Sequence, residues 1–259
     1  MQRISLAHDD VGAGPAIVLV HGHPFDRSMW RGQLQALGGE FRVIAPDLRG
    51  YGQSPALGGV ARMSDLAGDV WGLLADLGVD DFAVVGLSMG GLVAMEMAIA
   101  DPQRIWALGL VATTAEPVTE DERSRRLALA DEVESRGMDP AVRMMAPQLF
   151  GLDPDPHVVE SIRDMMAGNN AQGAAAALRG RAERPDYRDG LRALRMPSWV
   201  CVGTRDAWST AAVTRELVAC LGNPRVLTLS EVGHLPNLEA PARFDRELLD
   251  FLRGAGVEG

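Results

Sequence analysis

Short runs of consecutive apolar residues alternate along this chain with longer segments in which apolar residues recur every three or four positions. The first pattern indicates buried strands, and the second indicates helices. We predict strands at residues 16–20, 42–45, 82–86, 105–111, 198–202 and 225–229. Because buried strands that alternate with helices are typical of a parallel sheet covered on both faces, the pattern predicts an α/β fold.

Clear helical periodicity follows the second, third and last of these strands. Ser64 is a candidate N-cap for a helix that keeps apolar residues on one face as far as Leu77. Residues 89–100 are apolar nearly all round, which indicates a helix buried against the centre of the sheet. Residues 241–253 are predicted to form a closing amphipathic helix, and residues 254–259 are expected to be a frayed tail.

The strand pattern stops between residues 113 and 197. Thr119 and Glu122 have the spacing of a capping box, which predicts the start of a charged helix that continues to about residue 136. Shorter helical segments are expected at residues 140–150, 156–167 and 171–183. This stretch is therefore predicted to be entirely helical.

The change of pattern divides the chain into a core and an insertion. We predict one core domain made of residues 1–115 and 191–259, and a helical cap at residues 116–190 that lies over the sheet edge. A chain of 259 residues, 47% of them hydrophobic, is long enough to bury the core of a single α/β domain of this size.

Composition excludes several functions. The net charge of −10 argues against nucleic-acid binding, which needs clustered positive charge. All 25 basic residues are arginine, so no lysine is present to form a Schiff base. Two cysteines without metal-ligand spacing predict no metal site. The chain has neither a signal-peptide pattern nor an apolar run of the ~20 residues that a membrane span needs, so we expect a cytoplasmic protein.

A serine between two glycines is the most informative chemical signal in the chain. In the run Gly86-Leu-Ser88-Met-Gly90, it follows a predicted strand and precedes a predicted helix. Glycines fit where strand and helix almost touch, and the tight turn directs the serine hydroxyl outward. Unpaired N–H groups and the positive dipole end of the helix favour an oxyanion there. We therefore predict that Ser88 is a nucleophile.

A serine hydroxyl becomes a nucleophile when a base removes its proton, and the base needs an acid to orient it. His234 follows the last predicted strand and a glycine, and Asp206 follows the preceding strand. Both lie at carboxyl ends of strands, where open α/β sheets bind ligands. The rival acid, Glu231, is so close to His234 in sequence that it cannot easily reach the ring. We predict a triad of Ser88, His234 and Asp206.

The loop after the first predicted strand is the candidate oxyanion loop. It reads His21-Gly-His-Pro-Phe25, and Gly22 lets it approach the serine turn closely. We predict that the backbone N–H groups of His23 and Met89 form the oxyanion hole. His21 is expected to anchor the loop rather than to react.

Together these motifs resemble those of the α/β-hydrolase family, and the resemblance covers nearly the whole chain. The motifs that carry it are His21-Gly22-x-Pro24, Asp47-Leu-Arg-Gly-Tyr-Gly-Gln-Ser54, Gly86-Leu-Ser-Met-Gly90, Gly203-Thr-Arg-Asp206 and Gly233-His234. The resemblance implies an α/β-hydrolase fold, and its nucleophile–acid–histidine order matches the triad. It also implies that residues 47–54 form a structural loop and that neither a metal nor an organic cofactor takes part.

Within the family, the details narrow the function only in part. A serine nucleophile is unlike haloalkane dehalogenases, and Leu87 differs from the asparagine common in C–C bond hydrolases. Residues 86–91 with Met29-Trp30 resemble enol-lactone hydrolases, whereas Pro24 resembles the cofactor-free haloperoxidase and perhydrolase branch. We expect a serine hydrolase that cleaves a small apolar ester or lactone through an acyl-enzyme. A perhydrolase, an enol-lactone hydrolase and a ligand-binding receptor on a hydrolase scaffold are the alternatives.

A substrate pocket is expected between the cap and the core. Methionines at helical spacing more often fill cores than line pockets, but a cap must present some apolar surface to whatever lies beneath it. The candidate pocket residues are Pro24, Phe25, Met144, Met145, Phe150, Met165, Trp208 and Leu235.

Overall fold

The computed structural model describes residues 4–256, and within them seven strands form one sheet in the order β1-β3-β2-β4-β5-β6-β7. β1 pairs antiparallel with β3, and all other neighbouring strands are parallel. The strands are β1 (His8–Val11), β2 (Ala16–Val20), β3 (Arg42–Pro46), β4 (Phe82–Leu87), β5 (Ile105–Val111), β6 (Ser198–Gly203) and β7 (Arg225–Leu229). The six parallel strands are those that the apolar runs predict.

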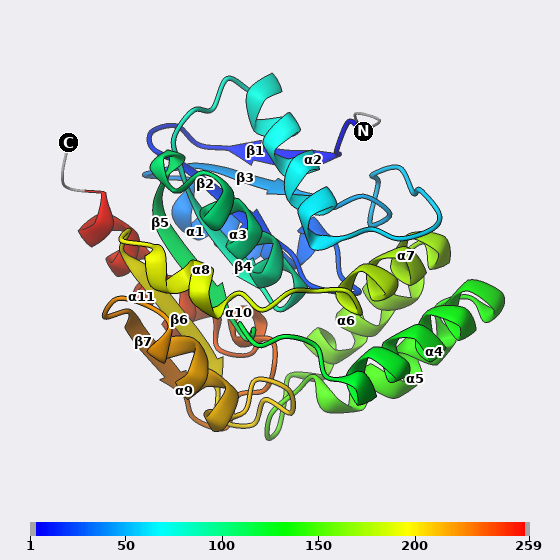
Figure 1. The fold of residues 1–259 in the computed structure, drawn as a ribbon. Coiled ribbons are helices and arrows are strands. Elements are labelled where there is room, and N and C mark those ends of the chain that lie inside the picture. Colours follow the sequence, from blue (N-terminus) through cyan, green and yellow to red (C-terminus); the bar gives the residue numbers. More distant parts are fainter. Residues whose placement is uncertain (1–3, 257–259) are drawn as a thin grey trace.

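Helices cover both faces of the sheet, as Figure 1 shows. They are α1 (Arg31–Leu37), α2 (Met63–Asp76), α3 (Met89–Ala100), α4 (Glu120–Arg136), α5 (Asp139–Met145), α6 (Pro156–Gly168), α7 (Ala171–Arg181), α8 (Arg188–Ala193), α9 (Ala211–Ala219), α10 (Pro236–Glu239) and α11 (Pro241–Ala255). Short 3₁₀ helices lie at Arg27–Trp30, Pro102–Arg104 and Ala146–Gln148. The chain therefore has the doubly covered α/β architecture that its hydrophobic pattern predicts.

Each face of the sheet has its own hydrophobic core, because successive residues of a strand point to opposite faces. In β2, Val18 and Val20 belong to the core shared with α2 and α3. Ile17 and Leu19 belong to the core shared with α1 and α11. Burial on both faces explains why this strand is apolar at every position instead of alternating.

The structure corrects two local predictions and adds one strand that the sequence pattern does not predict. Ser64 does not cap α2: the helix begins at Met63, and Arg62 is its N-cap. The C-terminal tail does not begin at residue 254, because α11 continues to Ala255. Residues 257–259 of that predicted tail lie outside the described residues. The pattern also gives no sign of β1, which is a short polar strand at the sheet edge.

Helices α4 to α7, which lie between β5 and β6, form a group of their own. Figure 1 shows α4 to α7 side by side at one end of the sheet, drawn in green at the lower right. α4 begins after Thr119, whose side chain and that of Glu122 complete the capping box that the sequence predicts. The predicted boundary at residue 190 falls inside α8, and α8 is joined to α3 by a hydrogen bond from the hydroxyl of its N-cap, Tyr187, to Glu96.

Within residues 4–256, none of the helices combines the length and the apolar character that crossing a bilayer requires.

Candidate active site

Ser88 occupies a strained turn between β4 and α3. Its φ of 55° and ψ of −112° lie outside the regions that non-glycine residues ordinarily adopt. Hydrogen bonds fix this conformation: the Ser88 N–H donates to Val111 O at 2.8 Å, and the Thr113 hydroxyl donates to Ser88 O at 2.8 Å. A Cβ atom at Gly86 would overlap the Gly90 carbonyl, so the steric reason predicted for this glycine pair is confirmed.

His234 and Asp206 are brought together at the carboxyl ends of β6 and β7. His234 Nδ1 lies 2.8 Å from Asp206 Oδ2, and both side chains are buried. The other carboxylate oxygen of Asp206 accepts backbone hydrogen bonds from Trp208 at 2.8 Å and Ser209 at 3.0 Å. A carboxylate held on both oxygens can orient the imidazole so that Nε2 remains available to a serine.

Electrostatics keep Asp206 ionised. Burial works against the charge, but the charge of His234, the hydrogen bond to it and the two backbone N–H groups together lower the pKa of Asp206. The rival acid has a different environment: Glu231 is exposed, and its carboxylate pairs with Arg205 at 2.8 Å. The structure therefore brings Asp206, and not Glu231, to His234.

The Ser88 hydroxyl itself is partly exposed at the same edge of the sheet. Within residues 4–256, no hydrogen bond joins it to the His234 ring. Hydrogen bonds between a nucleophile and its base are often long before substrate binds, so the lack of this bond is compatible with a triad.

The loop that carries His234 is held by a residue that the sequence does not reveal. Glu239, at the end of α10, accepts hydrogen bonds from the backbone N–H groups of Gly151, Gly233 and Leu235, at 2.7 to 3.2 Å. The N–H of His234 donates to Leu149 O at 2.7 Å. The histidine loop is thus attached both to its own helix and to the segment that follows α5.

His21 anchors the candidate oxyanion loop, as predicted. Its Nε2 accepts a hydrogen bond from the Leu48 N–H at 2.9 Å, so Nδ1 carries the proton and donates to Gly22 O at 2.8 Å. A Cβ atom at Gly22 would lie only 3.0 Å from Leu87 O and 3.2 Å from Ser88 Cβ. The oxyanion loop therefore lies directly against the serine turn.

The loop of residues 47–54, which donates the Leu48 N–H to His21, is itself held in place by hydrogen bonds. The buried Asp47 carboxylate accepts backbone hydrogen bonds from Arg27 and Gln53 at 2.8 Å and pairs with the Arg27 guanidinium. The Ser54 hydroxyl donates to Asp47 O at 2.7 Å. These contacts give the loop the structural role that the resemblance implies.

His23 is buried and contacts a residue of that same loop. Its Nδ1 lies 2.7 Å from the Tyr51 hydroxyl, while its Nε2 is buried without a hydrogen-bond partner among the described residues. Burial, with the positive charge of Arg181 and the neighbouring His21 as further causes, places the pKa of His23 well below its ordinary value. The ring is therefore neutral at pH 7. No described residue accepts a hydrogen bond from the backbone N–H of His23 or of Met89.

The candidate pocket residues differ in how deeply their side chains are buried. Phe25 and Leu235 are fully buried within the hydrophobic core, and Met145, Phe150 and Met165 are partly buried against it. The side chain of Met144 is 47% exposed and faces solvent.

The Pro24 carbonyl accepts a hydrogen bond from the buried Asn169 at 2.9 Å, and the peptide bond before Pro24 is cis. The Trp208 ring packs edge-on against His234, with 4.7 Å between ring centroids.

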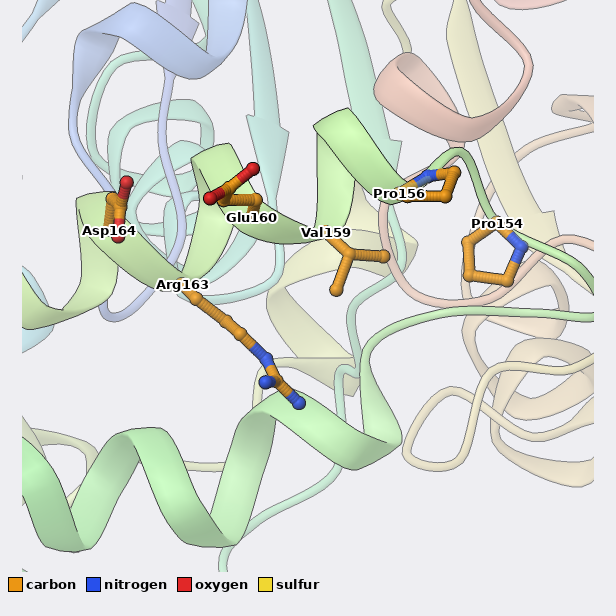
Figure 2. A pocket seen from close by; sticks show the side chains of 6 residues that line it. All are labelled: Pro154, Pro156, Val159, Glu160, Arg163 and Asp164. Carbon is orange, nitrogen blue, oxygen red and sulfur yellow. The ribbon is translucent and has the colours of Figure 1, made fainter.

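Two cavities lie elsewhere. One, of about 400 Å³, is on α6 and the segment before it; Figure 2 shows its lining side chains Pro154, Pro156, Val159, Glu160, Arg163 and Asp164. The other, of about 570 Å³, lies beside α9 at the β6 and β7 edge. Neither is lined by Ser88, Asp206 or His234. Residues 4–256 contain no cluster of three or more histidine, cysteine or carboxylate side chains suited to a metal.

Two proteins of known structure share this fold and are 30% or more identical to this chain in sequence. A thermophilic esterase from Thermogutta terrifontis, solved with malate bound, superposes with a TM-score of 0.95 and 38% identity over 97% of this chain and 94% of its own. The enol-lactonase from Burkholderia xenovorans superposes with a TM-score of 0.90 and 30% identity, covering 96% of this chain and 97% of its own.

Comparison of sequences alone also identifies an enol-lactonase as a similar protein. The 3-oxoadipate enol-lactonase 2 of Acinetobacter baylyi is 30% identical over 234 residues, which are 89% of this chain and 86% of that protein. A model of the Alpha/beta hydrolase family matches residues 17–247, a span that includes the serine turn, the oxyanion loop and the Asp206–His234 pair. The protein with this strained serine and this buried acid–histidine pair belongs to the alpha/beta hydrolase family.

Proposed function

We propose that this protein hydrolyses carboxylic esters or lactones through a covalent acyl-enzyme on Ser88. The observation that carries the proposal is the buried Asp206–His234 pair at the sheet edge where the strained turn holds Ser88. Relatives named as esterases and enol-lactonases support it, because both names describe cleavage of the bond between an acyl carbon and an oxygen.

In the proposed mechanism, His234 Nε2 removes the proton of the Ser88 hydroxyl as its oxygen attacks the substrate carbonyl. Asp206 orients the ring through Nδ1 and stabilises the imidazolium that forms. The unpaired backbone N–H groups of His23 and Met89 receive the oxyanion, and the neutral His23 ring needs no counter-ion there. His234 then protonates the leaving alcohol oxygen, and water attacks the acyl-enzyme in the second half of the cycle.

We also propose that α4 to α7, within predicted residues 116–190, act as a cap over Ser88. Asn169 supports this role, because its side chain bridges the end of α6 to the oxyanion loop. Its Nδ2 donates to Pro24 O at 2.9 Å, and its Oδ1 accepts from the Gly52 N–H at 2.9 Å. Met145, Phe150 and Met165 are the cap side chains that we propose contact substrate, whereas the exposed Met144 is not among them.

Turnover of p-nitrophenyl acetate and of a small lactone tests the proposal. Ser88→Ala should lower kcat by about 10⁴- to 10⁶-fold, the range found when a triad serine is removed. Ser64→Ala changes an exposed serine and should leave kcat unchanged. Full activity of Ser88→Ala would overturn the mechanism. Absence of turnover by the wild-type chain on every ester and lactone would favour the receptor alternative.

A further inference from the structure

Three arginines gather where α4 and the end of α7 meet the loops after β2 and β3. They are Arg126 on α4, Arg181 at the end of α7 and Arg184 just beyond it. One carboxylate, Glu122, serves two of them, at 3.5 Å from Arg126 and 3.5 Å from Arg184. Arg181 has no carboxylate oxygen within 4.0 Å among residues 4–256 and interacts with Glu122 only at longer range. We call Arg126, Arg181, Arg184 and Glu122 the arginine cluster, and its formal charge is positive.

The cluster has nitrogen atoms without partners. Arg126 Nη1 and Arg181 Nε are buried, and neither makes a hydrogen bond within residues 4–256. Arg184 differs, because its Nε donates to Glu116 O at 3.0 Å. Buried polar atoms are nearly always hydrogen-bonded, so two unpaired guanidinium nitrogens in one cluster require an explanation.

The unpaired nitrogens lie beside the candidate active site. Arg181 interacts electrostatically with the Tyr51 hydroxyl, which is 2.7 Å from His23 Nδ1. Arg181 and Arg126 are both close enough to His23 to lower its pKa. His23 Nε2 is a third buried nitrogen without a partner. The cluster therefore adjoins the loop whose backbone we propose holds the oxyanion.

The single carboxylate of Glu122 compensates the three positive charges of the cluster only in part. Burial and the neighbouring arginines lower the pKa of Arg126 to about 9 and that of Arg181 to about 10. Both side chains still carry their charge at pH 7, in surroundings that oppose it.

Elsewhere on the same helix the chain places acids opposite an arginine. Arg179, two residues before Arg181, pairs with Asp131 at 2.8 Å and with Glu134 at 2.7 Å, both on α4. No such partner is supplied to Arg181, although the chain contains 35 acidic residues. The cluster therefore keeps an excess of positive charge and unpaired guanidinium donors, which a bound carboxylate would satisfy.

We propose that the ester or lactone cleaved at Ser88 carries a carboxylate, and that Arg126 and Arg181 bind it beneath α4 and α7. The planar guanidinium presents paired N–H donors that match the two oxygens of a carboxylate. This inference rests on the proposed function, because it identifies the substrate class of the same site. It adds a carboxylate to the small apolar ester or lactone that the sequence predicts.

A pair of substrates tests the charge directly. Monomethyl glutarate and methyl pentanoate present similar methyl esters, but only the first carries a carboxylate. We expect the wild type to favour the charged ester in kcat/KM by about 10- to 100-fold, the effect of one charge-assisted hydrogen bond. In Arg181→Gln and Arg126→Gln this ratio should fall towards one, mainly through KM. Arg179→Gln, on the same helix, should keep the wild-type ratio.

Binding without turnover separates this inference from the proposed function. In Ser88→Ala, calorimetry should detect binding of glutarate but not of the neutral glutaramide, and Arg181→Gln added to that variant should weaken it. Glutarate should also raise the Tm of the wild type, since a ligand that binds the folded state stabilises it. These measurements need no catalysis, so they hold or fail independently of ester turnover.

Two different results would contradict the proposed carboxylate site. Neutral esters turned over as well as charged ones, with acylation of Ser88, would leave the proposed function standing and overturn the carboxylate site. A lower Tm in Arg181→Gln with an unchanged substrate ratio would show that the arginine stem only packs against its neighbours. That outcome too would overturn the carboxylate site.

Discussion

At the scale of single residues, two side chains of the candidate site are fixed by hydrogen bonds at both of their polar atoms. His21 is fixed by the Leu48 N–H and by Gly22 O, and Asp206 is fixed on both of its oxygens. Ser88 differs, because its backbone is strained and its hydroxyl is left without a partner within residues 4–256. Strain of this kind persists only where the surroundings enforce it, and it is concentrated at functional sites.

Asp206→Asn tests which acid orients His234. The asparagine side chain would stabilise the wrong imidazole tautomer, so kcat should fall by about 10⁴-fold, as in another Ser-His-Asp triad. Steady-state kinetics on p-nitrophenyl acetate measure the change, and a thermal melt establishes that the variant is folded. Near-normal kcat in folded Asp206→Asn would remove Asp206 from the mechanism.

Glu231→Gln is the matched control. Glu231 is exposed and pairs with Arg205, an interaction worth about 0–1 kcal/mol at a surface. Its kcat should therefore stay within about twofold of the wild type, because a change below 1 kcal/mol in stability leaves the folded population unchanged. A severe loss of kcat in Glu231→Gln would identify it as the acid instead.

Some of these residues can be predicted from the sequence and others cannot, for a physical reason. Ser88, Asp206 and His234 each follow a strand in a local turn motif, so short stretches of sequence were sufficient to identify them as candidates. Tyr51, Glu239 and Arg181 act through partners that lie far along the chain or on backbone atoms. No local pattern records such contacts.

At the scale of elements, the loops at the carboxyl ends of the strands are fastened to one another rather than only to their own strands. Glu239 is the clearest case, because one carboxylate accepts N–H groups from the His234 loop and from Gly151. The parallel strands were predictable because each is a continuous apolar run. β1 was not, since its sequence His-Asp-Asp-Val is polar and its pairing depends on the distant β3.

Glu239→Gln tests whether this fastening positions the catalytic base. Glutamine has one acceptor oxygen where glutamate has two, so at least one partly buried N–H loses its partner, at a cost of about 1–3 kcal/mol. We expect a Tm lower by about 2–4 °C for each kcal/mol lost, and a lower kcat with little change in KM. Glu160→Gln, at an exposed position of α6, should change neither. An unchanged kcat in Glu239→Gln would limit Glu239 to a role in stability.

At the scale of the whole molecule, two hydrophobic cores cover the two faces of one sheet, and helices α4 to α7 lie beyond its end (Figure 1). Sequence periodicity predicted that α4, α6 and α7 exist and where α4 begins. It could not predict that α4 and α7 pack together and bring Arg126 and Arg181 towards His23, because that arrangement is tertiary. The carboxylate site that we propose depends on this packing and not on any single motif.

Labelling by a fluorophosphonate shows directly whether Ser88 is the covalent nucleophile. Intact-mass spectrometry of the treated protein should show a single adduct, which peptide mapping should place on the peptide that contains Ser88. Asp206→Asn should react far more slowly, because the serine loses an oriented base. An adduct on another serine, or an unlabelled protein that still hydrolyses esters, would contradict the account.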